Sequence, residues 1–116
     1  YDLSGFLQWG FNFYNGRNSL NTLDPWRNAD GFGTWPSGDP FLVYPGENGK
    51  PLESLRAVTL REAMQDLRAL NWLADLIGPD KARALVADWT LDHCPASGEE
   101  MLSLRDTINR LITENL

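Results

Sequence analysis

The sequence is poor in the residues that several kinds of chemistry require. Its 116 residues include a single cysteine, Cys94, so an internal disulfide is excluded. They also include a single histidine, His93. These two follow Asp92, but a zinc site needs three or four protein ligands, and neighbours in sequence rarely face one another as a base and a nucleophile must. No glycine-rich phosphate loop occurs either. We therefore predict no metal site and no cofactor.

Positive charge is also scarce. Ten Lys and Arg stand against sixteen Asp and Glu, which gives a net charge of −6 and a pI near 4.6. Nucleic-acid binders usually carry basic clusters and this sequence has none, so we expect neither nucleic acid nor an acidic membrane surface as a partner. No stretch approaches the roughly 20 apolar residues of a membrane span. The chain starts at Tyr1 without a methionine or a signal peptide, which we interpret as a processed or excised piece, so its compartment stays open.

What the sequence does contain is unevenly distributed. Hydrophobic residues make up 42% of it, which favours one folded core. Eleven of the thirteen aromatic residues lie within the first 45 positions, and a charged, leucine-rich pattern fills the remainder. We therefore predict a single domain or fragment, 1–116, with a strand and aromatic-loop part over 1–53 and a helical part over 54–116.

Two strands are predicted in the aromatic part. Residues 5–14 lack helical spacing, so we expect a strand with Leu7, Trp9, Phe11 and Phe13 on one face and Phe6, Gln8, Gly10, Asn12 and Tyr14 on the other. Residues 41–44 form a short apolar run between prolines, which is typical of a buried strand. The Asn-, Asp-, Gly- and Pro-rich stretch between them, 15–39, predicts a long functional loop.

A long first helix is predicted in the second part. Thr59 and Glu62 have capping-box spacing, although the helix could begin as early as Ser54, and Gly78 marks its end. Its apolar residues follow at helical intervals: Leu60, Ala63, Met64, Leu67, Leu70, Ala74 and Ile77.

Two shorter helices are predicted to follow. Pro79 suits the first turn of a helix that runs to about Trp89, and Ser97 with Glu100 forms a capping box for the last one. Their expected apolar positions are Leu85, Val86 and Trp89 in the second helix, and Met101, Leu104, Ile108, Leu111 and Ile112 in the third.

Acidic residues offer little for catalysis. Paired-carboxylate hydrolysis needs two acids on opposite sides of one bond. Asp24, Asp30 and Asp39 each lie beside or one residue from a Pro or Gly, where Asp commonly serves turn geometry. Glu99 and Glu100 fall in a first helical turn, where acids offset the helix dipole. We therefore assign no catalytic residue.

The aromatic half nevertheless predicts a carbohydrate site. A pyranose presents apolar C–H faces and a rim of hydroxyls, so a sugar pocket needs flat rings beside polar groups. Any single ring could equally belong to the core or to an interface. The predicted substrate-binding residues are Gln8, Trp9, Asn12, Tyr14, Trp26, Trp35, Asp39 and Tyr44, with Asn15 and Arg17 nearby.

A series of motifs resembles the end of glycoside hydrolase family 123 proteins. The similar segments, in the same order, are Gly5–Tyr14, Asp24–Trp26, Trp35–Asp39 and Phe41–Gly46, followed by Ser54–Arg56, Leu60–Glu62 and Gln65–Asp66. The resemblance covers about 5–77. It implies an α+β fragment that forms the C-terminal portion of a (β/α)8-type barrel, with two or three short strands and a long aromatic loop before about three helices.

The resemblance also implies a chemistry. Characterised members are β-N-acetylgalactosaminidases, in which the substrate's acetamido group attacks the anomeric carbon and an adjacent Asp-Glu pair assists. No Asp-Glu dipeptide occurs here, so the pair is expected upstream and this chain alone is expected to be inactive. The chain departs from the family at Val58, where an acid is usual, and at Leu67-Arg68, in place of a common Tyr-Glu pair.

Two hypotheses follow. In the first, the chain contributes the pocket walls of a glycoside hydrolase similar to β-N-acetylhexosaminidases and galactosaminidases, with carbohydrate and the rest of the parent barrel as partners. In the second, it is a non-catalytic carbohydrate-binding or protein-interaction module. The unpaired strand edges of an excised barrel also predict self-association of the isolated chain.

Overall fold

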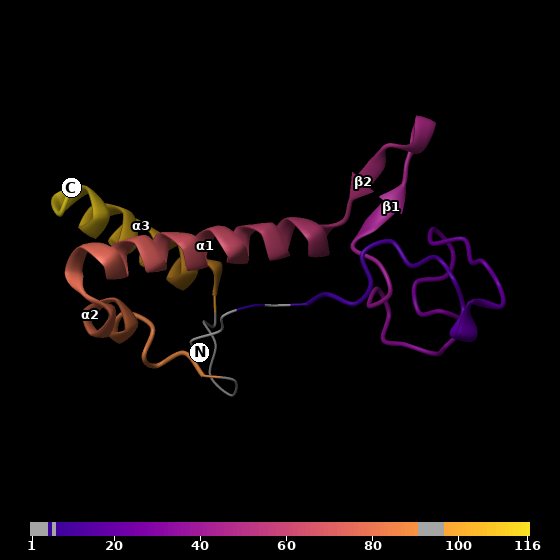
Figure 1. The fold of residues 1–116 in the computed structure, drawn as a ribbon, viewed down its shortest axis with the longest axis horizontal. Coiled ribbons are helices and arrows are strands. Elements are labelled where there is room, and N and C mark those ends of the chain that lie inside the picture. Colours follow the sequence, from indigo (N-terminus) through magenta and orange to yellow (C-terminus); the bar gives the residue numbers. More distant parts are fainter. Residues whose placement is uncertain (1–4, 6, 91–96) are drawn as a thin grey trace. The chain divides into compact units, whose positions relative to one another are not determined.

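The computed structural model describes residues 5, 7–90 and 97–116, and the chain forms two compact units, Asp2–Arg61 and Glu62–Leu116. The first unit contains the aromatic stretch and a hairpin of β1 (Val43–Pro45) and β2 (Pro51–Glu53) (Figure 1). The second contains α2 (Pro79–Ala84) and α3 (Gly98–Glu114), and α1 (Leu55–Ile77) begins in the first unit and ends in the second. The protein is therefore α+β, and within the described ranges none of its helices is long and apolar enough to cross a membrane.

The β-hairpin is short and antiparallel. Val43 pairs with Glu53 and Pro45 with Pro51. The connection turns through Asn48 at positive φ, a conformation that Asn tolerates better than most residues. The strand predicted at 41–44 is thus confirmed in part, shifted to Val43–Pro45. β2 was not predicted, because three residues that include a proline give no alternating pattern.

The strand predicted at 5–14 is wrong. Among its described residues only Asn12 forms a β-bridge, an isolated one with Phe41. The Phe13 N–H donates to the Pro40 carbonyl at 3.1 Å and Phe11 accepts from Leu42 at 2.8 Å, so the segment follows 40–42 too briefly to count as a strand. A strand needs continuous ladder partners, and apolar alternation alone does not supply them. Phe6 lies outside the described residues.

Helix α1 begins earlier than its internal capping box predicted. The Ser54 hydroxyl accepts a hydrogen bond from the Ala57 N–H at 3.2 Å, as an N-cap does. Thr59 lies inside the helix, where its hydroxyl donates to the Leu55 carbonyl at 2.8 Å, so the Thr59–Glu62 box is wrong. The end at Ile77 is as predicted, and Gly78 follows with a positive φ.

The other two helices agree with the sequence at their starts. Pro79 occupies the first turn of α2, but this helix ends at Ala84 instead of near Trp89. Ser97 caps α3 by accepting from the Glu100 N–H at 3.3 Å, which confirms that capping box.

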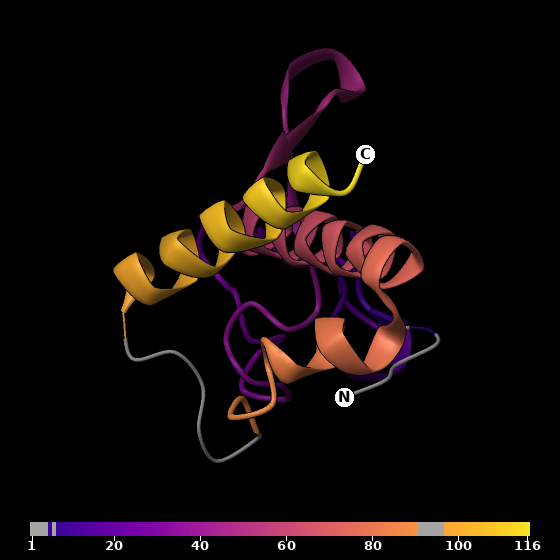
Figure 2. The same ribbon diagram turned by 90° about the vertical axis from the view of Figure 1, so that its left-hand side faces the viewer.

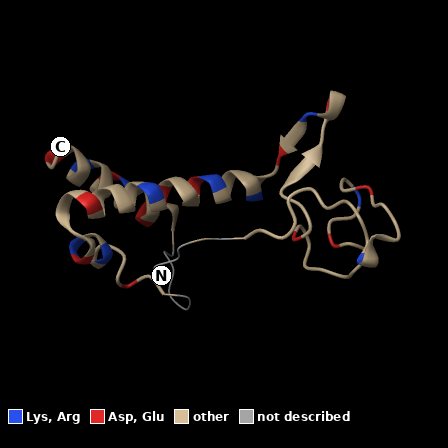
Figure 3. Ribbon diagram, in the orientation of Figure 1, with Lys and Arg blue, Asp and Glu red and all other residues tan. Residues whose placement is uncertain are grey.

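The helical unit has a small core. α1, α2 and α3 pack around it (Figure 2). Its buried members are Leu73, Ala82, Ile108 and Ile112. Leu73 was not among the predicted apolar positions, whereas the predicted Met64 and Leu67 are exposed. Both basic and acidic positions occur along α1 (Figure 3).

The first unit has its own apolar centre, built mainly from the segment that leads into the hairpin. Phe41 is fully buried, and Leu42 and Val43 are nearly so. Leu23, in the long loop, is also buried. Within this buried segment, Phe41 contacts the rings of Tyr14 and Tyr44 in the candidate site.

Candidate functional site

Trp26 and Tyr44 form a stacked aromatic pair. Their ring centroids lie 4.6 Å apart and their planes differ by 28°. Trp26 keeps 60% of its surface exposed, so the pair faces solvent. Asp24 sets the turn that presents it, because its Oδ1 accepts a hydrogen bond from the Trp26 backbone N–H at 3.0 Å. Two segments distant in sequence, the long loop and β1, thus build one flat apolar surface.

Phe41 and Tyr14 support this pair from the buried side. The ring of Phe41 meets Tyr44 edge-on at 5.2 Å and also contacts Tyr14 at 5.5 Å. The Tyr14 hydroxyl donates to the Val43 carbonyl at 2.6 Å. Desolvation by burial raises the pKa of Tyr14 above its ordinary value, so this donor keeps its proton at neutral pH. Tyr14 therefore holds the strand and does not present its hydroxyl to a ligand.

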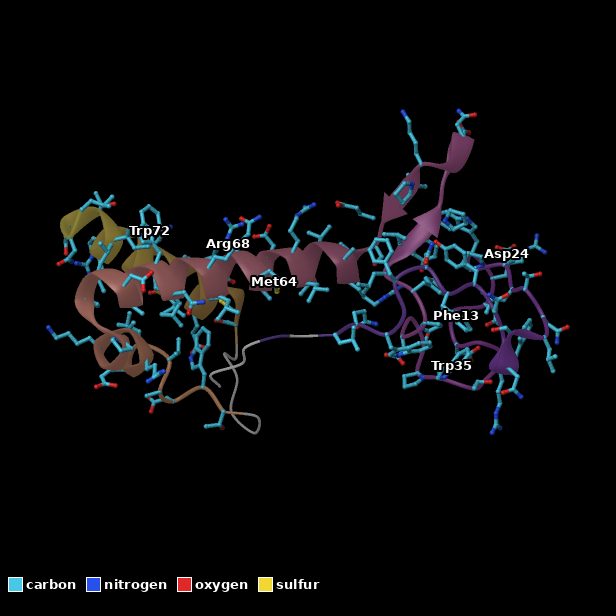
Figure 4. The ribbon with its side chains drawn as sticks, in the orientation of Figure 1. Phe13, Asp24, Trp35, Met64, Arg68 and Trp72 are labelled. Atoms are coloured by element: carbon cyan, nitrogen blue, oxygen red, sulfur yellow. The ribbon has the colours of Figure 1, made fainter. Side chains whose placement is uncertain are left out.

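A second aromatic group surrounds Trp35. The rings of Trp9, Phe13 and Trp35 lie 5.3–5.8 Å from one another, and Figure 4 shows Phe13 and Trp35 in the same part of the first unit. The Trp9 indole N–H donates to Asp39 Oδ2 at 2.9 Å, and the Gln8 amide donates to the Asp39 carbonyl at 3.2 Å. Gly31 leaves room for this packing, since a Cβ there would lie 2.2 Å from the Trp35 ring.

The eight predicted site residues therefore fall into two groups. One contains Tyr14, Trp26 and Tyr44, and the other contains Gln8, Trp9, Trp35 and Asp39. No ring contact between described residues joins the two groups. Asn12 stands outside both: its residue is exposed, and its bridge to Phe41 is made by the backbone.

Asp24, Asp30, Glu99 and Glu100 lie where their neighbours predicted, whereas the carboxylate of Asp39 accepts from the distant Trp9 indole instead of a turn N–H. Asp24 holds the turn before Trp26, and Asp30 Oδ1 accepts from the Gly33 N–H at 3.0 Å. Glu99 and Glu100 lie in the first turn of α3. Within the described parts of the chain, no group of three or more His, Cys, Asp or Glu could hold a metal ion. The Asp92-His93-Cys94 sequence lies outside those parts.

Arg56 belongs to the site, and the sequence reasoning missed it. Its guanidinium lies over the Phe41 ring at 5.6 Å and over Tyr44 at 6.0 Å, and its Nη2 donates to the Phe41 carbonyl at 3.0 Å. A signal was present in the sequence. Arg56 lies in the first turn of a helix, where the dipole favours acids over bases, so a different partner was to be expected.

The helical unit has a pocket of a different character. It has a volume of about 270 Å³ and an apolar lining that includes Leu70, Trp89 and Met101, with Asp66 and Arg105 at its wall. Arg105 Nε lies 2.7 Å from Asp66 Oδ1 as an ion pair, while its Nη2 makes the aligned hydrogen bond to Asp66 Oδ2 at 2.8 Å. That bond raises the pKa of Arg105. Arg105 is thus already paired with Asp66 at this pocket. We therefore place the candidate site on the aromatic rings of the first unit instead.

Comparison with known families adds an independent observation. The family model described as glycoside hydrolase 123, catalytic domain, matches residues 1–73. Among curated proteins, none matches the chain. The matched range contains both aromatic groups and Arg56, and it continues along α1 to the core residue Leu73. Because this range is more than half of the chain, the protein belongs to the glycoside hydrolase 123 family and carries sequence of its catalytic domain.

Proposed function

We propose that this chain forms walls of the substrate pocket of a glycoside hydrolase, and that the Trp26–Tyr44 pair is the surface against which a sugar ring lies. One observation carries the proposal: the two rings are stacked 4.6 Å apart while Trp26 keeps 60% of its surface in solvent. Exposing a large aromatic surface costs free energy that a sugar's C–H face would recover on binding.

Polar groups near the second aromatic cluster suit the hydroxyl rim of a sugar. Asp39 Oδ2 accepts a hydrogen bond from the Trp9 indole N–H, and the other oxygen of a carboxylate can accept hydrogen bonds from further donors. Asn12 lies outside both aromatic groups, but it is exposed and has an amide that can both donate and accept. In the proposed pocket these groups receive hydroxyl hydrogens while Trp9 and Trp35 supply apolar contact.

The catalytic groups are proposed to lie outside this chain. In the family mechanism the acetamido oxygen of the substrate attacks the anomeric carbon, and the glycosidic oxygen leaves with a proton from an acid. An adjacent Asp-Glu pair serves that chemistry, and this sequence has none. We therefore propose that the parent is a (β/α)8-type barrel acting on β-N-acetylhexosaminides and that this chain is its C-terminal portion.

Titration with a sugar tests the binding surface. We expect methyl β-N-acetylgalactosaminide to change the tryptophan fluorescence of the chain. Trp26→Ala should weaken binding roughly fivefold, because an aromatic contact contributes about 0.5–1.5 kcal/mol. Trp72→Ala is the matched control, since Trp72 is also half exposed but lies on α1 in the helical unit. Equal weakening by both variants would contradict the proposed surface.

The rival function is a non-catalytic module for carbohydrate or protein binding. It shares the sugar surface with the first proposal but needs no acid pair in the parent. Sugar binding by a parent protein that hydrolyses no glycoside would favour this rival. Absence of sugar binding by both parent and chain would leave protein interaction as the use of the exposed rings.

A further inference from the structure

We propose that Arg56 is a positioning residue for the Trp26–Tyr44 pair: it holds the Tyr44 ring in the orientation that the Trp26 indole stacks on. The proposal rests on the proposed sugar surface but concerns its construction, so the two can fail separately. Tyr44 contacts both partners, with Trp26 at 4.6 Å and the Arg56 guanidinium at 6.0 Å.

The guanidinium is itself fixed by the segment before β1. Its Nη2 donates to the Phe41 carbonyl at 3.0 Å, and its Cζ lies 5.6 Å from the centre of the Phe41 ring. Gly38 makes space for it, because a Cβ at that position would lie 2.7 Å from Arg56 Cζ and 2.8 Å from Nη1. The side chain therefore fills the space between Gly38 and the two rings.

The charge of Arg56 points to the same role. In the described part of the chain no ion pair involves Arg56, and its buried Nε has no hydrogen-bond partner. An arginine in a first helical turn also opposes the helix dipole. Neither a carboxylate nor the helix terminus explains its position, so the aromatic faces and one carbonyl are its partners.

Arg56 also connects two elements of the first unit. It starts in the first turn of α1, next to the Ser54 cap, and ends against the residues that lead into β1. Loss of its planar group would leave Tyr44 with the edge contact to Phe41 and the stack on Trp26 alone. We expect the Tyr44 side chain then to sample more than one rotamer, which would break up the flat surface.

Near-ultraviolet circular dichroism tests this role without any ligand, because a fixed Trp–Tyr stack gives an aromatic band. Trp26→Ala identifies that band in the wild-type spectrum. Arg56→Gln should remove most of it while the far-ultraviolet spectrum stays unchanged, and it should lower sugar affinity about fivefold. Arg56→Lys keeps the charge but not the planar fork, so it should restore less than half of the band.

Two further variants keep the test decisive. Gly38→Ala retains the arginine but displaces it and also strains a backbone position of φ 87°, so it should reduce the same band, and the far-ultraviolet spectrum must stay unchanged for the comparison to count. Arg61→Gln removes a more exposed arginine of the same helix, paired with Glu53 at 2.8 Å, and should leave the band unchanged. A wild-type band in Arg56→Gln would overturn the proposal, as would a fall in sugar affinity without loss of the band. If no sugar binds the wild type, the sugar surface fails while the band still decides the role of Arg56.

Discussion

At the residue scale, side chains that join two segments were the hardest to predict. Asp24 and Asp30 were expected in turns because their own neighbours signal turns, and the structure confirms this. Arg56 was missed because its partners, Phe41 and Tyr44, lie more than ten positions away. Local chemistry is visible in a sequence, whereas the partner of a long side chain depends on the folded path of the backbone.

Ser54 gives a prediction at this scale. Its buried hydroxyl accepts from the Ala57 N–H at 3.2 Å and donates to the Leu42 carbonyl at 2.6 Å, so it both caps α1 and ties the helix to the core segment. Ser54→Ala should lower the free energy of unfolding by about 1–2 kcal/mol. Ser97→Ala removes an exposed cap with one bond, and should cost about half as much.

Urea denaturation of the two variants measures the difference. The fluorescence of the tryptophans reports both units, because Trp72 and Trp89 lie in the helical unit, and far-ultraviolet circular dichroism reports the helices. Equal losses for Ser54→Ala and Ser97→Ala would contradict the second role of Ser54.

At the element scale, helices were predicted better than strands. The end of α1 and the start of α3 follow from local signals, namely Gly78 and the Ser97 cap. The start of α1 does not follow from local signals, because both Ser54 and Thr59 could serve as its N-cap. Ser54 is the cap in the structure, and its hydroxyl also donates to the Leu42 carbonyl. The strand expected at 5–14 failed because alternation shows which faces differ but not whether a partner strand exists. The aromatic groups were predicted as one site, and the structure divides them in two.

The hairpin carries a prediction of association. β1 and β2 are three residues each and leave edges without strand partners among the described residues, and Leu52 is 49% exposed on β2. We propose that the isolated chain self-associates by edge pairing or by exchange of helices. Light scattering should give a mass above that of a monomer, and Leu52→Lys should lower it because charge on an edge opposes pairing. A monomer at every concentration would contradict this proposal and weaken the barrel-fragment interpretation.

At the scale of the whole molecule, the family is established and the activity is proposed. The match to the glycoside hydrolase 123 catalytic domain over 1–73 agrees with the motif resemblance read from the sequence. Substrate and barrel architecture remain proposals that are based on that family relationship. The part that we propose for this chain is an aromatic surface formed by Trp26 and Tyr44, with the Arg56 guanidinium 6.0 Å from the Tyr44 ring.

Turnover by the full-length parent protein tests the central claim most directly. Aryl β-N-acetylgalactosaminide, aryl β-N-acetylglucosaminide and the unacetylated aryl galactoside are offered to the parent, to its Trp26→Ala variant and to this chain alone. We predict that the parent hydrolyses an N-acetylated substrate, that Trp26→Ala raises KM roughly fivefold with little change in kcat, and that the chain alone is inactive. No hydrolysis of any substrate by the parent, or an unchanged KM in Trp26→Ala, would contradict the account.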